Sequence, residues 1–548
     1  MAAANRDLKM IADGQANALQ SSNRYPTLYQ INTRVWLAEL SEKLGRPANL
    51  DDIEDIELER FKAMGFESLW FLSVWQTGAL GQKVSRSQPG WLAEFRDTLP
   101  DLQDADIEGS GFSIADYRVH KKLGGDLALE RLRKRLNERG QRLWLDFVPN
   151  HVGLDHVFLE EHPEYFIAGS EDDLASSPQN FVRVRNSRGE LILAHGRDPY
   201  FDGWPDTLQL NYAHAGLRQA MMDELLRIAG QCDGVRCDMA MLVLPEIFER
   251  TWGEQLARGG GQGESYQFAS FWPEAIAYVR ARYPQFCFMA EVYWDMEWTL
   301  QQQGFDFTYD KRLYDRLRSA DAGAVRGHLL ADLHYQSAMA RFLENHDEPR
   351  AAATFGPAQH QAAALLTYLT PGLRFFHQGQ LEGKQKRISP HLVRGPAEAT
   401  DRRLQTFYEK LLKLLQTPLY HQGQWRLLSS TPAWEGNWTA DCFISFFWQG
   451  DHGERQLVIV NYSDHQSQCH LPLSMLDQLG LDIQEGLWRL QDDFNNTVFD
   501  RDGSQLRFPG LYVDLGPWQY HIFTLTQLEK ESLNSSESSS QNLQSSWS

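Results

Sequence analysis

Two short stretches decide the fold: RLWLDFVPNH at residues 142–151 and DGVRCD at residues 233–238. Each contains a run of mostly apolar residues that ends in charged or polar side chains. Apolar runs of this length are typical of strands that are buried on both faces of a parallel sheet. Polar residues at the end of such a strand indicate the edge of the sheet where ligands bind.

Six further runs have the same character: TLYQI at 27–31, SLWFL at 68–72, FCFMAE at 286–291, FDF at 305–307, RFLE at 341–344 and LRFF at 373–376. Between the runs, apolar residues recur at helical spacing, as at Leu129, Leu132 and Leu136. Eight strands alternating with helices predict an α/β protein with a (β/α)8 TIM barrel over residues 25–415. A doubly wound open sheet has the same local pattern and is the alternative.

Two parts of the chain depart from this alternation. Residues 149–214 follow the third strand without a regular pattern and are rich in Gly, Pro, Asp and aromatic residues, which predicts an inserted loop domain. Beyond the barrel, the runs FISFFW, LVIVNY and YHIFTL predict a C-terminal antiparallel β-sandwich domain over residues 420–529. Residues 1–24 are expected to form an N-terminal extension, and the Ser-rich residues 530–548 a disordered tail.

Composition excludes some partners. The formal net charge of −20 and the absence of a basic patch argue against nucleic acid and against anionic membrane surfaces. The five cysteines follow no disulfide or zinc-site spacing. Neither a signal peptide nor a long apolar span is present, so a cytoplasmic location is expected. The oligomeric state stays open.

Polar side chains end four of the eight runs. They are Asp146, Asn150 and His151 after the third run, Arg236 and Asp238 in the fourth, Glu291 in the fifth, and Asn345, His346, Asp347 and Arg350 after the seventh. In a barrel, these side chains meet on the rim formed by the carboxyl ends of the strands. Carboxylates that converge on one rim suit the cleavage of glycosidic bonds, in which one carboxyl group is protonated and a second is ionised.

The neighbours of two carboxylates predict different roles. Arg236 lies two residues before Asp238, on the same face of a strand, and is expected to hold Asp238 ionised as a nucleophile. Apolar neighbours of Glu291 favour its protonated form, as a general acid requires. If the reaction retains configuration, these two carboxyl groups are expected to lie about 5–5.5 Å apart.

The four segments LWLDFVPNH, DGVRCD, FMAEV and FLENHD resemble, in order, the four signature regions of the α-amylase family, glycoside hydrolase family 13. GSGFSIADYRVHKKLGG at 109–125 and PGLRFFHQGQLEG at 371–383 also resemble family segments. The resemblance covers roughly residues 25–530. Four ordered regions are far more specific than one motif.

The resemblance implies a role for each matching residue. Asp238 falls on the nucleophile, Glu291 on the general acid/base, and Asp347 on the third carboxylate, which grips sugar hydroxyls and stabilises the transition state. Substrate-binding residues are expected at Phe112, which would stack on the sugar ring, at the hydrogen-bonding His151 and His346, at Arg236 as partner of the nucleophile, and at Arg350.

One segment departs from the family pattern. After Asp238 the chain reads Met239-Ala240-Met241-Leu242, where many starch-cleaving relatives carry a Lys-His pair at the last two positions. In those relatives the pair serves leaving-group subsites and, through the His backbone, a structural calcium. Asn150 matches a calcium-ligand position, but one oxygen falls far short of the six to eight that calcium takes. No metal and no cofactor are therefore predicted, and calcium has no support in the sequence.

The resulting hypothesis is a retaining α-glycosidase that acts on α-glucosides or short α-glucans by double displacement. A transglucosylase, or a phosphorylase of sucrose or another disaccharide, would use the same three carboxylates; a non-catalytic carbohydrate-binding barrel is a further alternative. KQKR at 384–387 is a faint hint of phosphate binding, although a surface loop is favoured. Residues 195–212 read HGRDPYFDGWPDTLQLNY. This segment fits a wall of the sugar site and a self-packed loop equally well, so both interpretations stay open. The exact sugar and linkage stay open.

Overall fold

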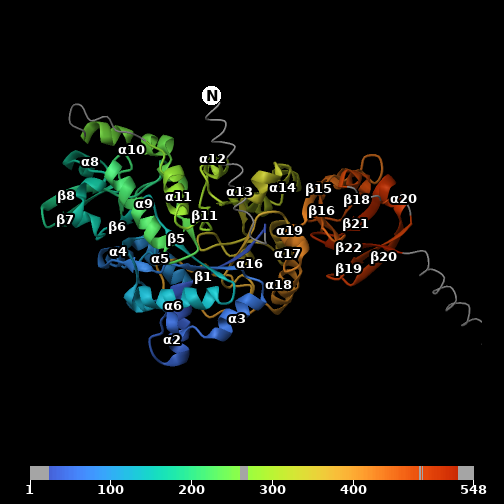
Figure 1. Ribbon diagram of the computed structural model, residues 1–548, viewed down its shortest axis with the longest axis horizontal. Helices are drawn as coiled ribbons and strands as arrows, with labels where there is room; N and C mark the ends of the chain where they lie inside the picture. Colours follow the sequence, from blue (N-terminus) through green and yellow to red (C-terminus); the bar gives the residue numbers. More distant parts are fainter. Residues whose placement is uncertain (1–23, 260–268, 480–482, 484–485, 529–548) are drawn as a thin grey trace, which may run out of the picture.

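The computed structural model describes residues 24–259, 269–479, 483 and 486–528 (Figure 1). The predicted N-terminal extension, apart from its last residue, and the predicted Ser-rich tail lie outside the described residues. All the residues predicted to line the active site lie within the described ranges.

Eight parallel strands form a closed barrel in the order β1-β14-β13-β12-β11-β10-β5-β2. The strands are β1 (Thr27–Asn32), β2 (Ser68–Leu72), β5 (Arg142–Phe147), β10 (Gly234–Cys237), β11 (Cys287–Ala290), β12 (Phe307–Tyr309), β13 (Met339–Arg341) and β14 (Leu373–His377). Because β1 pairs in parallel with both β2 and β14, the sheet has no edge, which excludes the open doubly wound alternative. All eight predicted strands are present, but β12 and β13 are displaced from the predicted runs 305–307 and 341–344.

Helices surround the barrel and bury the apolar faces that the sequence predicts. Helix α6 (Gly125–Asn137) buries Leu129, Leu132 and Leu136. Two further helices, α9 (Ala215–Ala229) and α11 (Trp272–Arg280), pack against one another on the outside of the barrel (Figure 1). Others in this layer are α2 (Thr33–Leu44), α3 (Asp55–Ala63), α10 (Pro245–Gly259), α13 (Lys311–Arg318), α14 (Ala322–Leu329), α17 (Pro357–Tyr368) and α18 (Arg402–Leu415).

The segment after β5 forms small sheets at one side of the barrel. Strand β6 (His151–Gly153) pairs antiparallel with β9 (Thr207–Gln209), and β7 (Phe181–Asn186) forms a hairpin with β8 (Gly189–Ala194). In Figure 1 the hairpin projects from the barrel beside α8 (Glu171–Ser176). The pairing of β6 with β9 brings the end of this segment back to the rim of the barrel.

A second loop region covers another part of the rim. Helices α4 (Ala79–Ser85) and α5 (Pro89–Thr98) follow β2, and they pack against the loop that follows β14. Their contact is a small apolar core made of Phe95, Leu99, Ile107 and Leu392. Two loops that are almost 300 positions apart in sequence therefore form one wall beside the barrel mouth.

The C-terminal region is a second, all-β unit, as predicted. A six-stranded sheet has the order β15-β16-β17-β22-β19-β20, and a two-stranded sheet joins β18 to β21. The strands are β15 (Gln424–Leu428), β16 (Phe443–Gln449), β17 (Arg455–Asn461), β18 (Ser467–Leu471), β19 (Leu487–Asp492), β20 (Thr497–Asp502), β21 (Leu511–Leu515) and β22 (Tyr520–Leu528). Apolar side chains from both sheets share one core, which confirms the predicted sandwich.

The sandwich packs against the barrel next to α14 (Figure 1). Trp448 on β16 donates its indole N–H to the Leu369 carbonyl oxygen at 2.8 Å. Tyr462 donates its hydroxyl to the Leu317 carbonyl oxygen at the end of α13, at 2.7 Å. These buried hydrogen bonds fix the two units relative to one another.

Two findings bear on the compositional predictions. All five cysteines are free thiols, in agreement with their lack of a disulfide pattern. Among the helices that the structure describes, none combines the length and the apolar character needed to span a membrane.

Candidate active site

A cavity of about 300 Å³ lies at the mouth of the barrel, small for a ligand site. Its lining residues are Trp91, Ser110, Phe112, His151, Trp204, Asp206, Thr207, Asp238, Met239, Glu291, Tyr293, Asp347 and His391. The three predicted catalytic carboxylates and two predicted substrate-binding residues, Phe112 and His151, are thus brought together. The strand ends of the barrel supply the carboxylates, and the surrounding loops supply the walls.

One buried guanidinium joins the three carboxylates. Arg236 on β10 is 1% exposed, and its Nη1 atom lies 2.5 Å from Oδ1 of Asp238. Its Nη2 atom lies 2.8 Å from Oε2 of Glu291 and 3.8 Å from Oδ2 of Asp347. Arg236 and Asp238 project to the same side because strand side chains alternate. A single positive charge is thereby shared among three acidic groups.

Aromatic rings hold this guanidinium in place. Its carbon lies 5.2 Å from the ring centre of Phe112, 5.6 Å from that of Trp70 and 5.7 Å from that of Tyr309. Burial alone would lower the pKa of Arg236, but the nearby Glu291, Tyr309 and Asp238 raise it well above its usual value. Arg236 therefore stays charged, and its rigid packing fixes the carboxylates that it contacts.

Glu291, which follows β11, is held at both oxygens. The Met239 backbone N–H donates to Oε2 at 2.7 Å, and the Tyr293 hydroxyl donates to Oε1 at 2.9 Å. Burial raises the pKa of Glu291 to about 8; Arg236 opposes this shift, and the neighbouring Asp238 reinforces it. Glu291 is therefore protonated at neutral pH, the state that a general acid requires.

The backbone after the fourth strand is strained where it meets Glu291. Met239 has a φ of +41°, a left-handed conformation that is uncommon for a residue other than glycine. This turn aims the Met239 N–H at the Glu291 carboxyl group and directs the chain into a buried 3-10 helix, Ala240–Val243. Strain of this kind concentrates at functional sites. The turn sets the position of Asp238 relative to Glu291.

Asp347 is the most accessible of the three carboxylates, with 41% of its side chain exposed, against 9% for Asp238 and 4% for Glu291. The His346 Nε2 atom lies 3.0 Å from Oδ2 of Asp347. On the other side of the ring, the Gln30 amide lies 2.8 Å from Nδ1. Burial lowers the pKa of His346 well below its usual value, so the ring is neutral. Since an amide nitrogen can only donate, Nδ1 accepts and the proton is on Nε2, which lies near Asp347 but makes no hydrogen bond among the described residues.

The remaining predicted substrate-binding residues form the sides of the cavity or lie just behind them. Phe112 stacks on His346 at a centroid distance of 5.3 Å. His151 packs against Trp204 from the inserted segment at 5.0 Å, and burial lowers its pKa, which favours the neutral ring. His346 itself lies behind Asp347 and Phe112 rather than among the lining residues.

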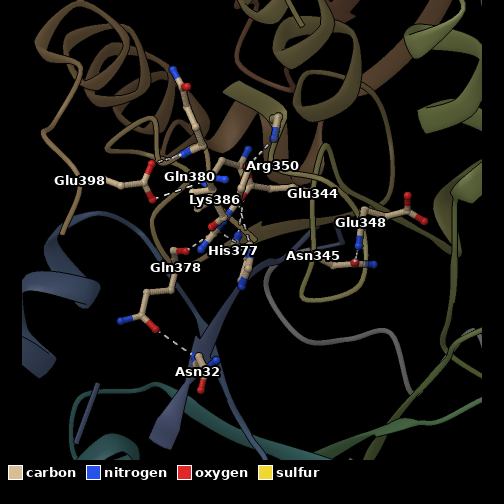
Figure 2. A network of polar contacts seen from close by, with 12 residues as sticks. Asn32, Glu344, Asn345, Glu348, Arg350, His377, Gln378, Gln380, Lys386 and Glu398 are labelled. Atoms are coloured by element: carbon tan, nitrogen blue, oxygen red, sulfur yellow. Dashed lines mark hydrogen bonds and ion pairs between the residues drawn. The ribbon is translucent and has the colours of Figure 1, made fainter. Parts of the chain in front are cut away.

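Arg350 departs from its predicted position. The structure places it outside the cavity, in the polar network of Figure 2. Its Nη1 atom donates to Oε1 of Glu344 at 2.6 Å and to the Gln378 carbonyl oxygen at 2.7 Å, and lies 2.9 Å from Nδ1 of His377. Its Nε atom donates to the Lys386 carbonyl oxygen at 3.2 Å. Arg350 joins the loops after β13 and β14 and has no group directed at the cavity carboxylates. The side chain follows Asp347 closely in sequence but contacts Glu344, His377 and Gln378.

The KQKR segment at 384–387 is a surface loop, as the sequence favours. Lys386 lies 2.9 Å from Oδ2 of Asp97, and Arg387 pairs with Glu94, both on α5. These cations are therefore occupied by carboxylates in the wall formed by α5 and the β14 loop. The segment gives no support for a phosphate site.

Several residues of the cavity were not predicted individually. Trp91 and His391 come from the two loops packed around Phe95, and the sequence contains no signal that these loops meet. Tyr293 could have been noticed, because it follows Glu291 by only two residues. Trp204 and Asp206 belong to the segment 195–212, for which the sequence left two interpretations equal; the structure places both at the cavity wall.

Asp206 is unusual among these residues because it is a buried acid without a cation. It is 3% exposed, and its Oδ2 atom has no hydrogen-bond partner among the described residues. Burial raises the pKa of Asp206 to about 7. A buried polar atom without a partner is costly, so this carboxyl group is a candidate to meet a sugar hydroxyl.

Asn150, which matches a calcium-ligand position of the family, is hydrogen-bonded within the protein. The Asn150 side-chain oxygen accepts a hydrogen bond from the Gln209 amide at 3.0 Å. Across the ranges that the structure describes, there is no group of three or more His, Cys, Asp or Glu side chains arranged to hold a metal ion.

Comparison with known proteins agrees with this geometry. The profile of the α-amylase catalytic domain matches residues 57–403, more than half of the chain. The chain belongs to the α-amylase family. The match includes all the strand ends that carry Arg236, Asp238, Glu291 and Asp347.

Individual relatives of this α-amylase family member are distant. Alpha-amylase MalA of Haloarcula japonica is 23% identical over 369 residues, which make up 66% of this chain and 44% of MalA. Alpha-amylase 3 of Dictyoglomus thermophilum is 22% identical over 53% of this chain and 57% of that protein. The chain thus spans about half the length of these two relatives.

Solved structures share the fold. The noncanonic maltogenic α-amylase AmyB of Thermotoga neapolitana superposes with a TM-score of 0.64 at 18% identity, covering 92% of this chain and 99% of that one. The Nostoc punctiforme debranching enzyme superposes with a TM-score of 0.60 at 16% identity, with the same 92% and 99% coverage. At these identities the likeness concerns the fold alone.

Proposed function

We propose that this chain is a retaining α-glycosidase that acts on α-glucosides or short α-glucans by double displacement. The observation that carries the proposal is the Arg236 cluster, in which one cation contacts Asp238, Glu291 and Asp347 at the barrel mouth. Such a site can hold one carboxyl group protonated beside another that is ionised.

In the first step, Asp238 attacks the anomeric carbon and forms a bond to it. Glu291 gives its proton to the glycosidic oxygen, whose bond to that carbon breaks and releases the leaving group. The raised pKa of Glu291, about 8, supplies the proton at neutral pH. Its two donors, the Met239 N–H and the Tyr293 hydroxyl, orient the carboxyl group and stabilise the carboxylate left after the transfer.

In the second step, the Glu291 carboxylate takes a proton from water or from a sugar hydroxyl. The oxygen attacks the anomeric carbon from the face that the leaving group vacated, and the bond to Asp238 breaks. Two inversions give net retention. Asp347 accepts hydrogen bonds from hydroxyls of the same sugar, and its Oδ2 atom lies 3.0 Å from Nε2 of His346. Arg236, already charged, balances the carboxylate that returns on Asp238.

The cavity favours a glycosyl residue as its occupant. Phe112 and Trp204 line the cavity with aromatic rings, and such rings suit sugars. Asp206 and Asp347 add oxygen acceptors, which suit a polyhydroxyl ligand better than an anionic one. The walls come from the inserted segment and from the loops after β2 and β14, and these determine which linkage enters.

Hydrolysis and glucosyl transfer use the same cluster and differ in the acceptor. Phosphorolysis remains an alternative, although Lys386 and Arg387 are paired with Asp97 and Glu94. A non-catalytic barrel stays the contrasting hypothesis. All three carboxylates are present and share Arg236, an arrangement that a binding module would not need.

Product analysis with the purified chain tests the proposal. The panel contains maltooligosaccharides, isomaltose, sucrose and trehalose, each with and without inorganic phosphate. We expect turnover of at least one α-glucoside, with glucose, maltose or a longer transfer product in the absence of phosphate. Turnover that occurs only with phosphate would identify the chain as a phosphorylase rather than a glycosidase. Absence of turnover, with sugar binding intact, would overturn the catalytic proposal in favour of a binding module.

A further inference from the structure

The loops after β2 and β14 close one side of the catalytic cavity. Trp91 of α5 and His391 of the β14 loop both line the cavity, and their ring centres lie 4.5 Å apart. The His391 ring also lies 5.6 Å from that of Phe95, and its Nδ1 atom lies 2.8 Å from Oγ of Ser85. Because both rings pack on the small core around Phe95, they have a defined position. We name the pair the Trp91–His391 wall.

Backbone contacts join the two loops at the wall itself. The Glu108 N–H, in the segment after β2, donates to the His391 carbonyl oxygen at 3.0 Å. The Val393 N–H donates to the Asp106 carbonyl oxygen at 2.9 Å, and Arg394 lies 2.8 Å from Oδ2 of Asp106. An ion pair near the surface contributes little, but hydrogen bonds between two backbones set their relative position. The wall is therefore a built part of the cavity.

The barrel topology places this wall opposite the general acid. The strands follow one another around the barrel in the order β1-β14-β13-β12-β11-β10-β5-β2. Strand β11, which precedes Glu291, is four positions from β1, the strand between β2 and β14. In a closed barrel of eight strands, four positions correspond to the opposite side. The loops after β2 and β14 thus start across the barrel mouth from Glu291.

The position of the general acid fixes the direction of a bound substrate. Glu291 protonates the glycosidic oxygen, so the leaving group lies on the Glu291 side of the glucosyl residue. The non-reducing end of that residue points away from the leaving group, toward the Trp91–His391 wall. The cavity measures about 300 Å³, at the lower limit for ligand pockets. It suits one sugar residue between acid and wall better than an internal stretch of chain.

Asp206 gives a second reason to place a chain end here. The Ser113 hydroxyl donates to the Asp206 carbonyl oxygen at 2.7 Å, and a β-carbon placed on Gly81 would lie 4.0 Å from that of Asp206. Because Gly81 and Ser113 belong to the segment after β2, Asp206 lies on the side of the wall. Its side chain lines the cavity, is 3% exposed and has no partner for Oδ2 among the described residues.

The missing partner of Asp206 distinguishes a terminal sugar from an internal one. An ionised carboxyl group can only accept hydrogen bonds, and its burial without a donor is costly. A terminal glucosyl residue carries free hydroxyls at its non-reducing end, and each of them can donate. In an internal residue, one of these oxygens belongs to a glycosidic bond and has no hydrogen. A site built to pair with a hydroxyl strongly rejects a ligand that lacks it.

We propose that the catalytic cavity accepts the non-reducing terminal glucosyl residue of its substrate and excludes internal residues. The Trp91–His391 wall blocks a longer chain, and Asp206 binds a free hydroxyl of the terminal residue. The proposal rests on the proposed function and narrows its substrate class to chain ends and disaccharides. The enzyme is then exo-acting: each turnover detaches one glucosyl unit and passes it to water or to an acceptor sugar.

Blocking the chain end tests the proposal. Maltoheptaose is compared with maltoheptaose whose terminal 4- and 6-hydroxyls are joined in an ethylidene acetal, and the first products are separated by chromatography. We expect the free chain to lose one glucosyl unit first, and the blocked chain to react at least about a hundredfold more slowly. Reaction of the blocked chain within about threefold of the free chain would overturn the proposal. So would maltose or maltotriose as the first product.

Two variants test Asp206. Asp206→Ala should lower kcat/KM on the best short substrate by about tenfold or more, since a hydrogen bond to a charged group is lost. Asp202→Ala, at an exposed aspartate of the same inserted segment that does not line the cavity, should leave kcat/KM unchanged. The thermal midpoint of Asp206→Ala should equal or exceed that of wild type, because a buried acid without a partner is removed.

A structural role for Asp206 would give a different result. A lower thermal midpoint together with lost activity would show that Asp206 supports the fold, and unchanged kcat/KM would show that it does not meet the substrate. Either result would overturn its assignment as the residue that recognises the chain end.

The outcome is separable from that of the proposed function. Similar turnover of the free and the blocked heptasaccharide would keep the glycosidase and overturn the exo-acting cavity alone. Turnover of disaccharides and of neither heptasaccharide would support the cavity, since the glucosyl residue of a disaccharide is terminal. Absence of turnover on every α-glucoside would overturn the proposed function and this inference with it.

Discussion

Two clusters at the ends of the barrel strands contain the same residue types and differ in how many acids share each arginine. In the active-site cluster, Arg236 is shared by Asp238, Glu291 and Asp347. In the network of Figure 2, Arg350 faces one carboxylate, Glu344, supported by His377. Both arginines are at most 5% exposed, so burial alone does not distinguish the clusters.

The difference appears in the pKa values of the two glutamates. Burial raises the pKa of both, but at Glu344 the opposing effects of Arg350 and His377 prevail, and the net pKa is lowered. At Glu291 the single Arg236 is shared, Asp238 adds repulsion, and the net pKa rises to about 8. One cation per acid gives a fixed ion pair; one cation for three acids leaves a group that can give up and take back a proton.

The largest expected effect is the loss of the nucleophile. Asp238→Asn removes the group that forms the covalent intermediate, and kcat should fall by about 10⁴-fold, as for other nucleophile removals. Steady-state kinetics on the best substrate of the panel measure the loss, and thermal unfolding verifies the fold. A loss of less than about tenfold would show that Asp238 is not the nucleophile.

Next in size is the effect of breaking the Arg350 network. Arg350→Met leaves Glu344 buried without its cation, and the free energy of unfolding should fall by about 3–5 kcal/mol. Urea denaturation measures this change. Adding Glu344→Leu should restore part of the loss, because both charges are then removed.

The activity of Arg350→Met distinguishes the two clusters further. The kcat of the folded protein should stay within about twofold of wild type, since Arg350 does not reach the cavity. A large rise in KM with unchanged stability would show instead that Arg350 binds substrate, as the sequence alone suggested.

A third prediction concerns pH. Active enzyme needs Glu291 protonated, so kcat/KM should fall as pH rises through the pKa of about 8, by about tenfold per pH unit above it. Because this pKa is raised above that of an unfolded glutamate, about 4.3, the stability that Glu291 contributes falls as pH rises from about 4.3 and is fully lost once pH has passed about 8. A pH–rate profile with constant kcat/KM up to pH 10 would contradict the assignment of Glu291 as the acid.

The smallest expected effect is at Tyr293. Tyr293→Phe removes a hydroxyl that donates to Oε1 of Glu291 and favours its ionised form. We expect kcat to fall by up to about tenfold and the alkaline limb of the pH profile to move to higher pH. A limb that moves to lower pH would show that Tyr293 acts on Glu291 in another way. Tyr278→Phe, at an exposed tyrosine on α11, is the matched control.

The sequence predicted the barrel because eight buried strands leave continuous apolar runs. It misplaced β12 and β13 by two residues, since strand ends depend on hydrogen-bond pairing with neighbours rather than on the apolar run itself. The sandwich was predicted for the same reason as the barrel. The contact between α5 and the loop after β14 left no pattern in either segment.

The site residues show the same contrast: those at strand ends could be predicted, and those on loops could not. Residues at strand ends, such as Asp238 and Glu291, meet because the barrel forces them to one rim. Trp91, Asp206 and His391 reach the cavity through loops whose paths are set by tertiary contacts. Arg350 shows the converse: its type and its distance from Asp347 in sequence suited a substrate site, but the turn after β13 directs it into Glu344.

The most direct test of the shared-cation mechanism is the configuration of the first product. Proton NMR recorded during the initial turnover of an α-glucoside follows the anomeric signals before mutarotation mixes them. We predict the α-anomer first, because Asp238 and Glu291 around Arg236 carry out two displacements. The β-anomer appearing first would mean a single displacement by water, and would contradict the assignment of Asp238 as the nucleophile.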